Sequence, residues 1–230
     1  MKTLIFALLT IFFCSIFSSS FAFDVDGDGK EGLAETIHSL QVVSGMLPSN
    51  SKIIFVGDID ATSVENGTVL LDVLENITDA SDSKPYLIKL EPGIYDLGSG
   101  SLNMKRNIDI EGSGEKNTSI TSAITGHLPN YPTVNGASDA EIRFLRIENT
   151  GTGTYSVAFR NYTASSTVTH VTAVASGATY NHAVTNYLGT PVYRNVTAIA
   201  NGSATTNRAF FTHNSSPVMI NVTDEPYFFP

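Results

Sequence analysis

A repeat in the second half of the chain constrains the fold more than any other feature. Branched apolar residues recur at separations of 26, 25 and 26 residues, at Leu145, Val171, Val196 and Val222. Glycines follow the first three of these at a constant offset of six residues, at Gly151, Gly177 and Gly202. A third column contains Phe159, Val184 and Phe210. Constant spacing of equivalent positions indicates that each unit of about 25 residues is one turn, stacked on the next.

The pattern between these columns is that of β-strands. Apolar and polar residues alternate, as they do in half-buried strands, and each turn holds several strands. Leucine-rich repeats of similar length are excluded because the leucine consensus and the helical half are absent. The sequence therefore predicts an all-β fold, a β-solenoid over residues 52–230, with the clearest repeats in residues 142–223.

Polar residues also occupy equivalent positions in successive repeats. Two pairs of asparagines are expected to form ladders, in which side-chain amides hydrogen bond along the solenoid axis: Asn195 with Asn221, and Asn161 with Asn186. Such ladders satisfy the backbone at the corners of each turn, so we interpret these residues as structural rather than catalytic.

A second aligned series is aromatic and consists of Tyr162, Tyr187 and His213. Stacked turns would place these rings about one rung, or ~4.8 Å, apart. Pointing outward, they would form a strip of ring faces suited to sugars. The alternative is a stack that shields a turn from solvent. These three residues are the candidate ligand-binding site.

The region before the repeats combines short strands with one helix. Residues 52–57 form an apolar run of strand length. A helix is expected over about 68–79, capped by Asn66 or Thr68, because apolar residues recur at helical spacing: Leu70, Val73, Leu74 and Ile77. The acidic residues that follow are expected to be solvated strand and turn residues: Asp109, Glu111, Asp139 and Glu141.

Residues 1–22 have the three parts of a secretory signal peptide. Lys2 precedes the apolar run 4–17, and the segment ends in the small-residue pattern Ser20-Phe21-Ala22, so cleavage is expected after Ala22. A membrane anchor is the alternative, but the run is shorter than the ~20 residues that span a bilayer. The sequence predicts a secreted, periplasmic or cell-surface protein with no membrane span after cleavage.

Residues 24–35 fit the twelve-residue loop of an EF-hand. In that pattern the Ca²⁺ ligands are three aspartates, a main-chain carbonyl and a bidentate glutamate: Asp24, Asp26, Asp28, Lys30 and Glu35. The alternative is a pair of ordinary turns at the two Asp-Gly pairs. We expect residues 23–46 to form a calcium loop and helix, with Ca²⁺ as a structural cofactor. The segment resembles a single EF-hand or a dockerin-type module. Dockerins carry two such loops and this segment has one, so the resemblance does not imply docking to a cohesin.

The balance of charges limits the possible partners. The 22 acidic residues outnumber the 13 basic ones, which gives a formal net charge of −9 and argues against binding to nucleic acid. Residues 149–223 contain no Asp or Glu. The acids are therefore concentrated in the first half of the chain, and the repeats are nearly uncharged.

Three segments carry a family resemblance: 86–95, 108–114 and 118–120, which read YLIKLEPGIY, IDIEGSG and TSI. They resemble the opening coils of pectin-lyase-like right-handed parallel β-helix proteins, especially pectinesterases. The resemblance covers about residues 84–125. It implies that the solenoid is a right-handed parallel β-helix and that the expected helix caps its N-terminal end.

The catalytic residues that this resemblance implies are missing from the chain. It implies a Gln near Tyr155 or Ser156, an Asp near residues 176–180 and a second Asp near 201–204, and none is present. Ester or glycoside cleavage by carboxylates needs such a positioned pair. We therefore assign no catalytic residue.

The sequence favours a secreted, non-catalytic protein that binds polysaccharide or a cell-surface glycan, or serves as an adhesin-like surface scaffold. One alternative is a diverged carbohydrate-active enzyme, similar to pectinesterases or pectate lyases. Another is a truncated repeat protein without independent function. The sequence stops one strand into a new coil, so self-association through an open C-terminal edge is also expected.

Overall fold

The computed structural model describes residues 32–33, 36–37, 39–40, 51–126, 131–202 and 205–226, apart from the side chains of residues 225 and 226. The chain divides into two compact units, Met1–Ser49 and Asn50–Pro230. In the first unit the described helical residues are Leu33, Thr36, Ile37, Ser39 and Leu40. Among all described residues, none belongs to a helix that has both the length and the apolar character to span a bilayer.

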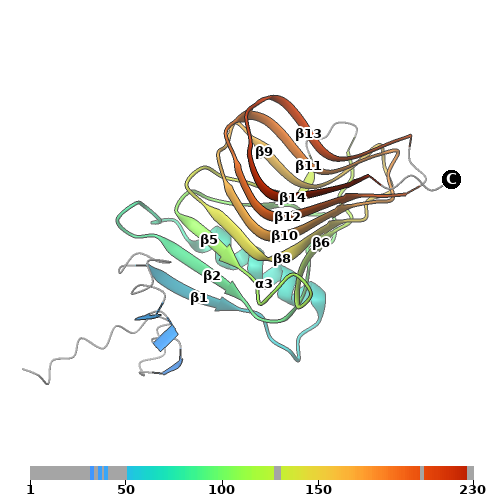
Figure 1. The fold of residues 1–230 in the computed structure, drawn as a ribbon. Coiled ribbons are helices and arrows are strands. Elements are labelled where there is room, and N and C mark those ends of the chain that lie inside the picture. Colours follow the sequence, from blue (N-terminus) through green and yellow to red (C-terminus); the bar gives the residue numbers. More distant parts are fainter. Residues whose placement is uncertain are drawn as a thin grey trace, which may run out of the picture. The chain divides into compact units, whose positions relative to one another are not determined.

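The second unit is a parallel β-helix, as the repeats predict (Figure 1). One sheet has nine strands, of which seven follow one another in the order β1 (Lys52–Val56), β2 (Tyr86–Leu90), β5 (Ile108–Glu111), β8 (Glu141–Asn149), β10 (Thr167–Ala175), β12 (Val192–Ala200) and β14 (Val218–Pro226). The other two are β3 (Gly93–Asp96) and β6 (Thr118–Ser122).

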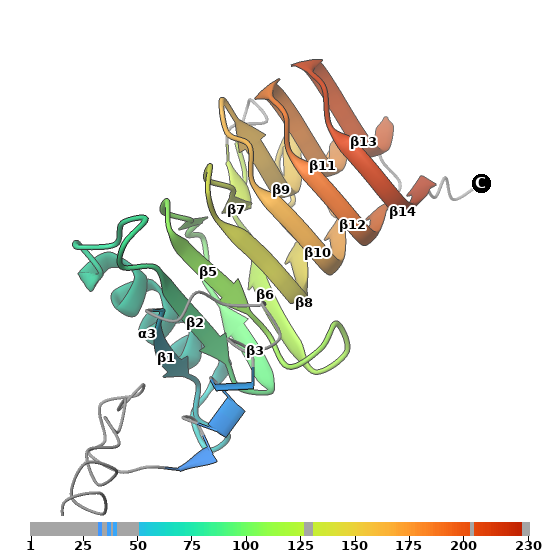
Figure 2. The ribbon, with the colours of Figure 1, turned by 60° about the vertical axis from the view of Figure 1, so that its left-hand side comes forward.

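A second sheet has five strands, in the order β13 (Thr206–Ser215), β11 (Tyr180–Gly189), β9 (Tyr155–Tyr162), β7 (Pro132–Asn135) and β4 (Leu102–Asn103). Strands β2 to β13 complete five turns, with β1 before them and β14 after them. Figure 2 shows the turns stacked in chain order from β1 to β14.

The register of the turns matches the sequence columns. Val171 pairs with Leu145 on one side and with Val196 on the other, and Val196 pairs with Val222. Leu145, Val171 and Val196 belong to the core, which runs through the inside of the turns, and Val222 packs against it. Hydrophobic burial along this column therefore stabilises each turn against its neighbours.

The long strands of the nine-stranded sheet turn a corner in mid-strand. One residue of each strand adopts the left-handed conformation, with φ between 51° and 55°: Phe144, His170, Asn195 and Asn221. Asn221 donates a hydrogen bond to Asn195 over 3.1 Å, which confirms this asparagine ladder. Phe144 and His170 continue the column as stacked rings 5.1 Å apart. Asparagine tolerates this conformation better than other non-glycine residues, so its place here has a backbone reason.

The second expected ladder, Asn161 with Asn186, lies inside the turns. Asn161 donates to Asn186 over 3.4 Å, and both amides bond to the hydroxyl of Tyr193, at 2.8 and 2.5 Å. Asn181 donates to Asn207 over 2.9 Å in a parallel arrangement on β11 and β13. The interior therefore holds polar ladders whose hydrogen bonds connect one turn to the next.

Helix α3 (Ser63–Asn76) begins earlier than the expected range of 68–79. Its N-cap is Thr62, which forms a capping box with Glu65, whereas we expected Asn66 or Thr68 to cap it. Asn66 instead bonds to the backbone of Asp58, and the hydroxyl of Thr68 donates to the helix backbone. The capping box therefore sets the start of the helix.

Gly67 lies where α3 packs closely against β3. A Cβ atom added there would lie 2.1 Å from the carbonyl oxygen of Asp96. We expect Gly67→Ala to lower the free energy of unfolding by about 2–3 kcal/mol because of this overpacking, although Ala favours helices by about 1 kcal/mol. Urea unfolding of this variant and of Asp72→Ala, an exposed control on the same helix, tests the contact; equal stability of the two variants would contradict it.

Candidate functional site

The three residues predicted to bind a ligand lie together in the five-stranded sheet. Tyr162 pairs in register with Tyr187, and Tyr187 pairs with His213. The ring centroids of Tyr162 and Tyr187 are 6.3 Å apart, and those of Tyr187 and His213 are 5.8 Å apart. Tyr162 is 54% exposed, so its ring is open to solvent. Ligand binding by these residues stays a prediction.

These three rings are part of a longer array. Tyr187 contacts Phe211 at 5.5 Å, and Phe211 stacks on His182 at 5.4 Å. Tyr155 meets His182 edge-on at 5.7 Å and stacks on Tyr180 at 4.9 Å. We call the whole array the aromatic face; its members are Tyr155, Tyr162, Tyr180, His182, Tyr187, Phe211 and His213.

A break in the alternation of β11 positions the centre of this face. Ala183 and Val184 are adjacent, yet both are packed in the core. The flanking positions, His182 and Thr185, therefore both lie on the outward side of the sheet, three residues apart. His182 and Phe211 were not predicted, because each occupies a column of the repeat that holds no other aromatic residue. Tyr155 and Tyr180 were detectable, since they are 25 residues apart.

The charged groups beside the aromatic rings are cations. The guanidinium of Arg208 lies 5.0 Å from the ring centroid of Phe211, and that of Arg160 lies 5.3 Å from the centroid of Tyr162. Burial lowers the pKa of Arg160. Because residues 149–223 contain no Asp or Glu, strands β9, β11 and β13 contribute no carboxylate to this face. The face is aromatic and positively charged, a combination that suits planar, hydroxylated or anionic ligands.

The face also covers two polar atoms that have no hydrogen-bond partner. These are His182 Nδ1 and Thr185 Oγ1, the buried side-chain atoms without a partner among the described residues. Burial, together with the charge of Arg208, lowers the pKa of His182 to about 4, so its ring is neutral at pH 7. An unsatisfied buried polar group costs about 1–3 kcal/mol, so two on one strand call for an explanation.

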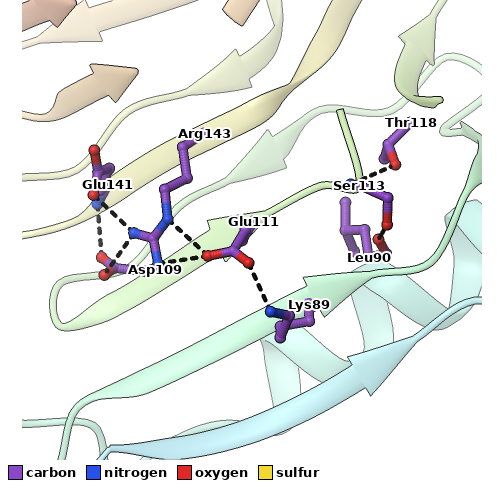
Figure 3. Close-up of polar contacts among 8 residues, drawn as sticks. All are labelled: Lys89, Leu90, Asp109, Glu111, Ser113, Thr118, Glu141 and Arg143. Carbon is purple, nitrogen blue, oxygen red and sulfur yellow. Dashed lines mark hydrogen bonds and ion pairs between the residues drawn. The ribbon is translucent and has the colours of Figure 1, made fainter. Parts of the chain in front are cut away.

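A group of charged side chains lies on the nine-stranded sheet. Figure 3 shows Arg143 pointing between Asp109, Glu111 and Glu141. Its guanidinium donates to Glu111 at 2.8 Å and to Glu141 at 2.7 Å, and approaches Asp109 at 3.5 Å. Lys89 pairs with the other oxygen of Glu111 at 2.7 Å. We call these five residues the ionic cluster.

The ionic cluster contradicts the expectation that these acids are solvated. The register stacks Lys89 on Glu111 and Glu111 on Arg143, so opposite charges face one another on successive turns. The side chains of Glu111 and Arg143 are only 12% and 9% exposed. Asp139 differs, because it is exposed and pairs with Arg106.

The chemistry of the ionic cluster is limited by its internal contacts. Burial raises the pKa of Asp109, against the opposing effects of a hydrogen bond from the Glu141 amide and the charge of Arg143. Glu141 also accepts a hydrogen bond from Thr169 over 2.5 Å. An acid–base pair for hydrolysis needs groups that are free to exchange protons with a substrate. Each carboxylate here already contacts a cation, which favours a structural role.

The described part of the chain holds no group of three or more His, Cys, Asp or Glu residues arranged for a metal ion. The predicted Ca²⁺ ligands all lie outside the described residues: Asp24, Asp26, Asp28, Lys30 and Glu35. Calcium binding therefore stays a prediction from the sequence.

Comparisons with known proteins give one structural likeness. No family model and no curated protein matches the sequence. Among solved structures, the pectin methylesterase PemA from Erwinia chrysanthemi is similar over 65% of this chain, with a TM-score of 0.42 and 11% sequence identity. This chain covers 56% of that structure, about half of its length. Nothing about activity follows from a likeness at this level.

Proposed function

We propose that this protein is a non-catalytic β-helix protein that binds polysaccharide through the aromatic face. The observation that carries the proposal is the continuous contact of the aromatic rings on the outward side of β9, β11 and β13. Successive turns of a β-helix are about 4.8 Å apart, similar to the length of one pyranose unit. The rings of Tyr162, Tyr187 and His213 are tilted to one another by 51° and 50°, so they do not stack face to face and can contact successive sugars of one chain.

The distribution of charge supports binding rather than cleavage. Strands β9, β11 and β13 contribute no carboxylate to the aromatic face, and the carboxylates of the ionic cluster are engaged by Arg143 and Lys89. Arg160 and Arg208 favour a polysaccharide with acidic groups over a neutral one. For an acidic polymer, affinity should therefore fall as salt is added, because screening weakens the contribution of exposed charges.

Tyr187 is the residue with which to test the proposal, because its ring contacts three other members of the face. We expect Tyr187→Ala to weaken polysaccharide binding about tenfold, equivalent to about 1.4 kcal/mol. Affinity electrophoresis in gels containing xylan, β-glucan, chitosan, alginate or polygalacturonate measures the effect. Phe55→Ala is the matched control, because Phe55 is an exposed aromatic residue on β1 of the other sheet.

Two outcomes would contradict the proposal. Wild-type protein that migrates unretarded in every gel would exclude polysaccharide binding by this chain under those conditions. Turnover of a polysaccharide that is lost in Asp109→Asn or Glu141→Gln would assign the ionic cluster as catalytic and support the alternative of a diverged carbohydrate-active enzyme.

The proposed location and cofactor rest on the sequence alone. Export is supported by the signal-like residues 1–22, and a structural Ca²⁺ by the EF-hand pattern at residues 24–35. An exported protein would meet extracellular or cell-surface glycans, which fits the binding role.

A further inference from the structure

We infer that His182 and Thr185 form a polar subsite within the aromatic face and that this subsite hydrogen bonds to the hydroxyl groups of one sugar unit. Phe211 and Arg208 cover the subsite. This inference rests on the proposed function and goes further, because it assigns the residues that recognise the sugar hydroxyls. The rings of the face provide stacking, which any sugar can use, whereas hydrogen bonds at fixed positions distinguish one sugar from another.

The first observation is the unmade hydrogen bonds. His182 is 4% exposed and Thr185 is fully buried, and neither His182 Nδ1 nor Thr185 Oγ1 has a partner. Folded proteins pair nearly all such groups, with protein, water or a ligand. The surrounding polar residues of β11 follow that rule, since Asn181 and Asn186 are both hydrogen bonded. The two unpaired groups therefore stand out from their own strand.

The second observation is where the two groups lie. Both are on the outward side of β11, in the middle of the aromatic face, and Thr185 pairs in register with Arg160 on β9 and Phe211 on β13. His182 pairs in register with Arg208 on β13 and stacks on the ring of Phe211. The unpaired atoms are therefore located at the proposed binding surface, rather than in the apolar core.

The side chains that cover the subsite are placed so that they can move. Phe211 and Arg208 both belong to β13, which is the last strand of the five-stranded sheet. Arg208 is exposed and Phe211 is partly exposed. A change of side-chain rotamer at Arg208 and Phe211 would open access to His182 and Thr185 without movement of the backbone.

The chemistry of the pair matches a sugar hydroxyl rather than a carboxylate. Neutral imidazole offers one donor and one acceptor, and a threonine hydroxyl offers both. Three residues of a strand span about 10 Å, so the two neutral groups can bond to hydroxyls on opposite sides of one pyranose ring. The stacked ring of Phe211, once displaced, would lie beside the sugar and keep its apolar contact.

The test uses variants that keep the shape but remove the polar atoms. We expect His182→Phe and Thr185→Val each to weaken binding about tenfold, because each removes one hydrogen bond to the ligand. The probe is a hexasaccharide of the polymer that retards wild-type protein most strongly, and calorimetry measures its affinity. Thr197→Val, on β12 of the other sheet, is the matched control and should bind as wild type does.

Stability and spectroscopy separate a ligand site from a structural one. Both variants should fold, and each should have an unfolding temperature equal to or above that of wild type, since each removes a buried polar group without a hydrogen-bond partner. The ¹⁵N resonances of the His182 ring should shift when the hexasaccharide saturates wild-type protein.

Wild-type affinity in both variants, or an unchanged His182 spectrum, would overturn the inference while Tyr187→Ala still supports the proposed function. No binding by wild-type protein would overturn both.

Discussion

Arg143→Met should lower the free energy of unfolding at pH 7 by about 3 kcal/mol, since it leaves three largely buried carboxylates without the cation that they share. The affected groups are Asp109, Glu111 and Glu141, all of which contact the guanidinium. Methionine keeps most of the side-chain volume, so the loss reports charge rather than packing. Chemical denaturation followed by circular dichroism measures the change. Arg146→Met is the control, because Arg146 forms a more exposed pair with Glu148.

The stability of Arg143→Met should also depend on pH, in a direction that the pKa of Asp109 determines. Burial raises the pKa of Asp109 in the folded protein above its ordinary value, and Arg143 opposes that rise. Removing Arg143 raises the pKa further, so the folded state of the variant binds protons more readily than the unfolded state. Its stability should then increase as the pH falls from 7 towards the ordinary pKa of Asp. Destabilisation that is equally large at pH 5 and pH 7 would contradict this account.

Tyr193→Phe is expected to lower the free energy of unfolding by about 2–4 kcal/mol, although it removes a single oxygen atom. Tyr193 is fully buried, and its hydroxyl accepts a hydrogen bond from Asn161 and donates one to Asn186. Without that hydroxyl, both amides lose a partner in a place that water does not reach. Urea denaturation measures the loss, and Tyr180→Phe, on the aromatic face, serves as the control. Equal stability of the two variants would show that the amides find other partners.

The sequence predicts the repeated half of the fold well, for a physical reason. From Leu145 onward the turns have nearly equal length, so residues that stack in space keep a constant separation along the chain. Tyr162, Tyr187 and His213 were grouped correctly on this basis. The predicted start of α3 was wrong because the capping box was overlooked. Its pattern, Thr62 followed three residues later by Glu65, can be recognised in the sequence.

The ionic cluster could not be found in the same way. Lys89, Glu111 and Arg143 are separated by 22 and 32 residues, because the loops of the early turns differ in length. No constant period marks these residues as neighbours, and acids without a visible partner are indistinguishable from solvated ones. His182 and Thr185 were not predicted to lie on one side of β11, because Ala183 and Val184 between them both face the core. The residue types alone do not indicate this break in the alternation of the strand.

The polar ladders inside the turns have a consequence for folding. An aliphatic column such as Val171 and Val196 would be buried almost equally well if one turn slipped along its neighbour by two residues. Asn161 and Asn186 would not tolerate that slip, because Asn161 would then face Val184 or Leu188 and the hydrogen bond between the two amides would be lost. The ladders therefore make misregistered stacking unfavourable, so that the native register between neighbouring turns is the most stable one.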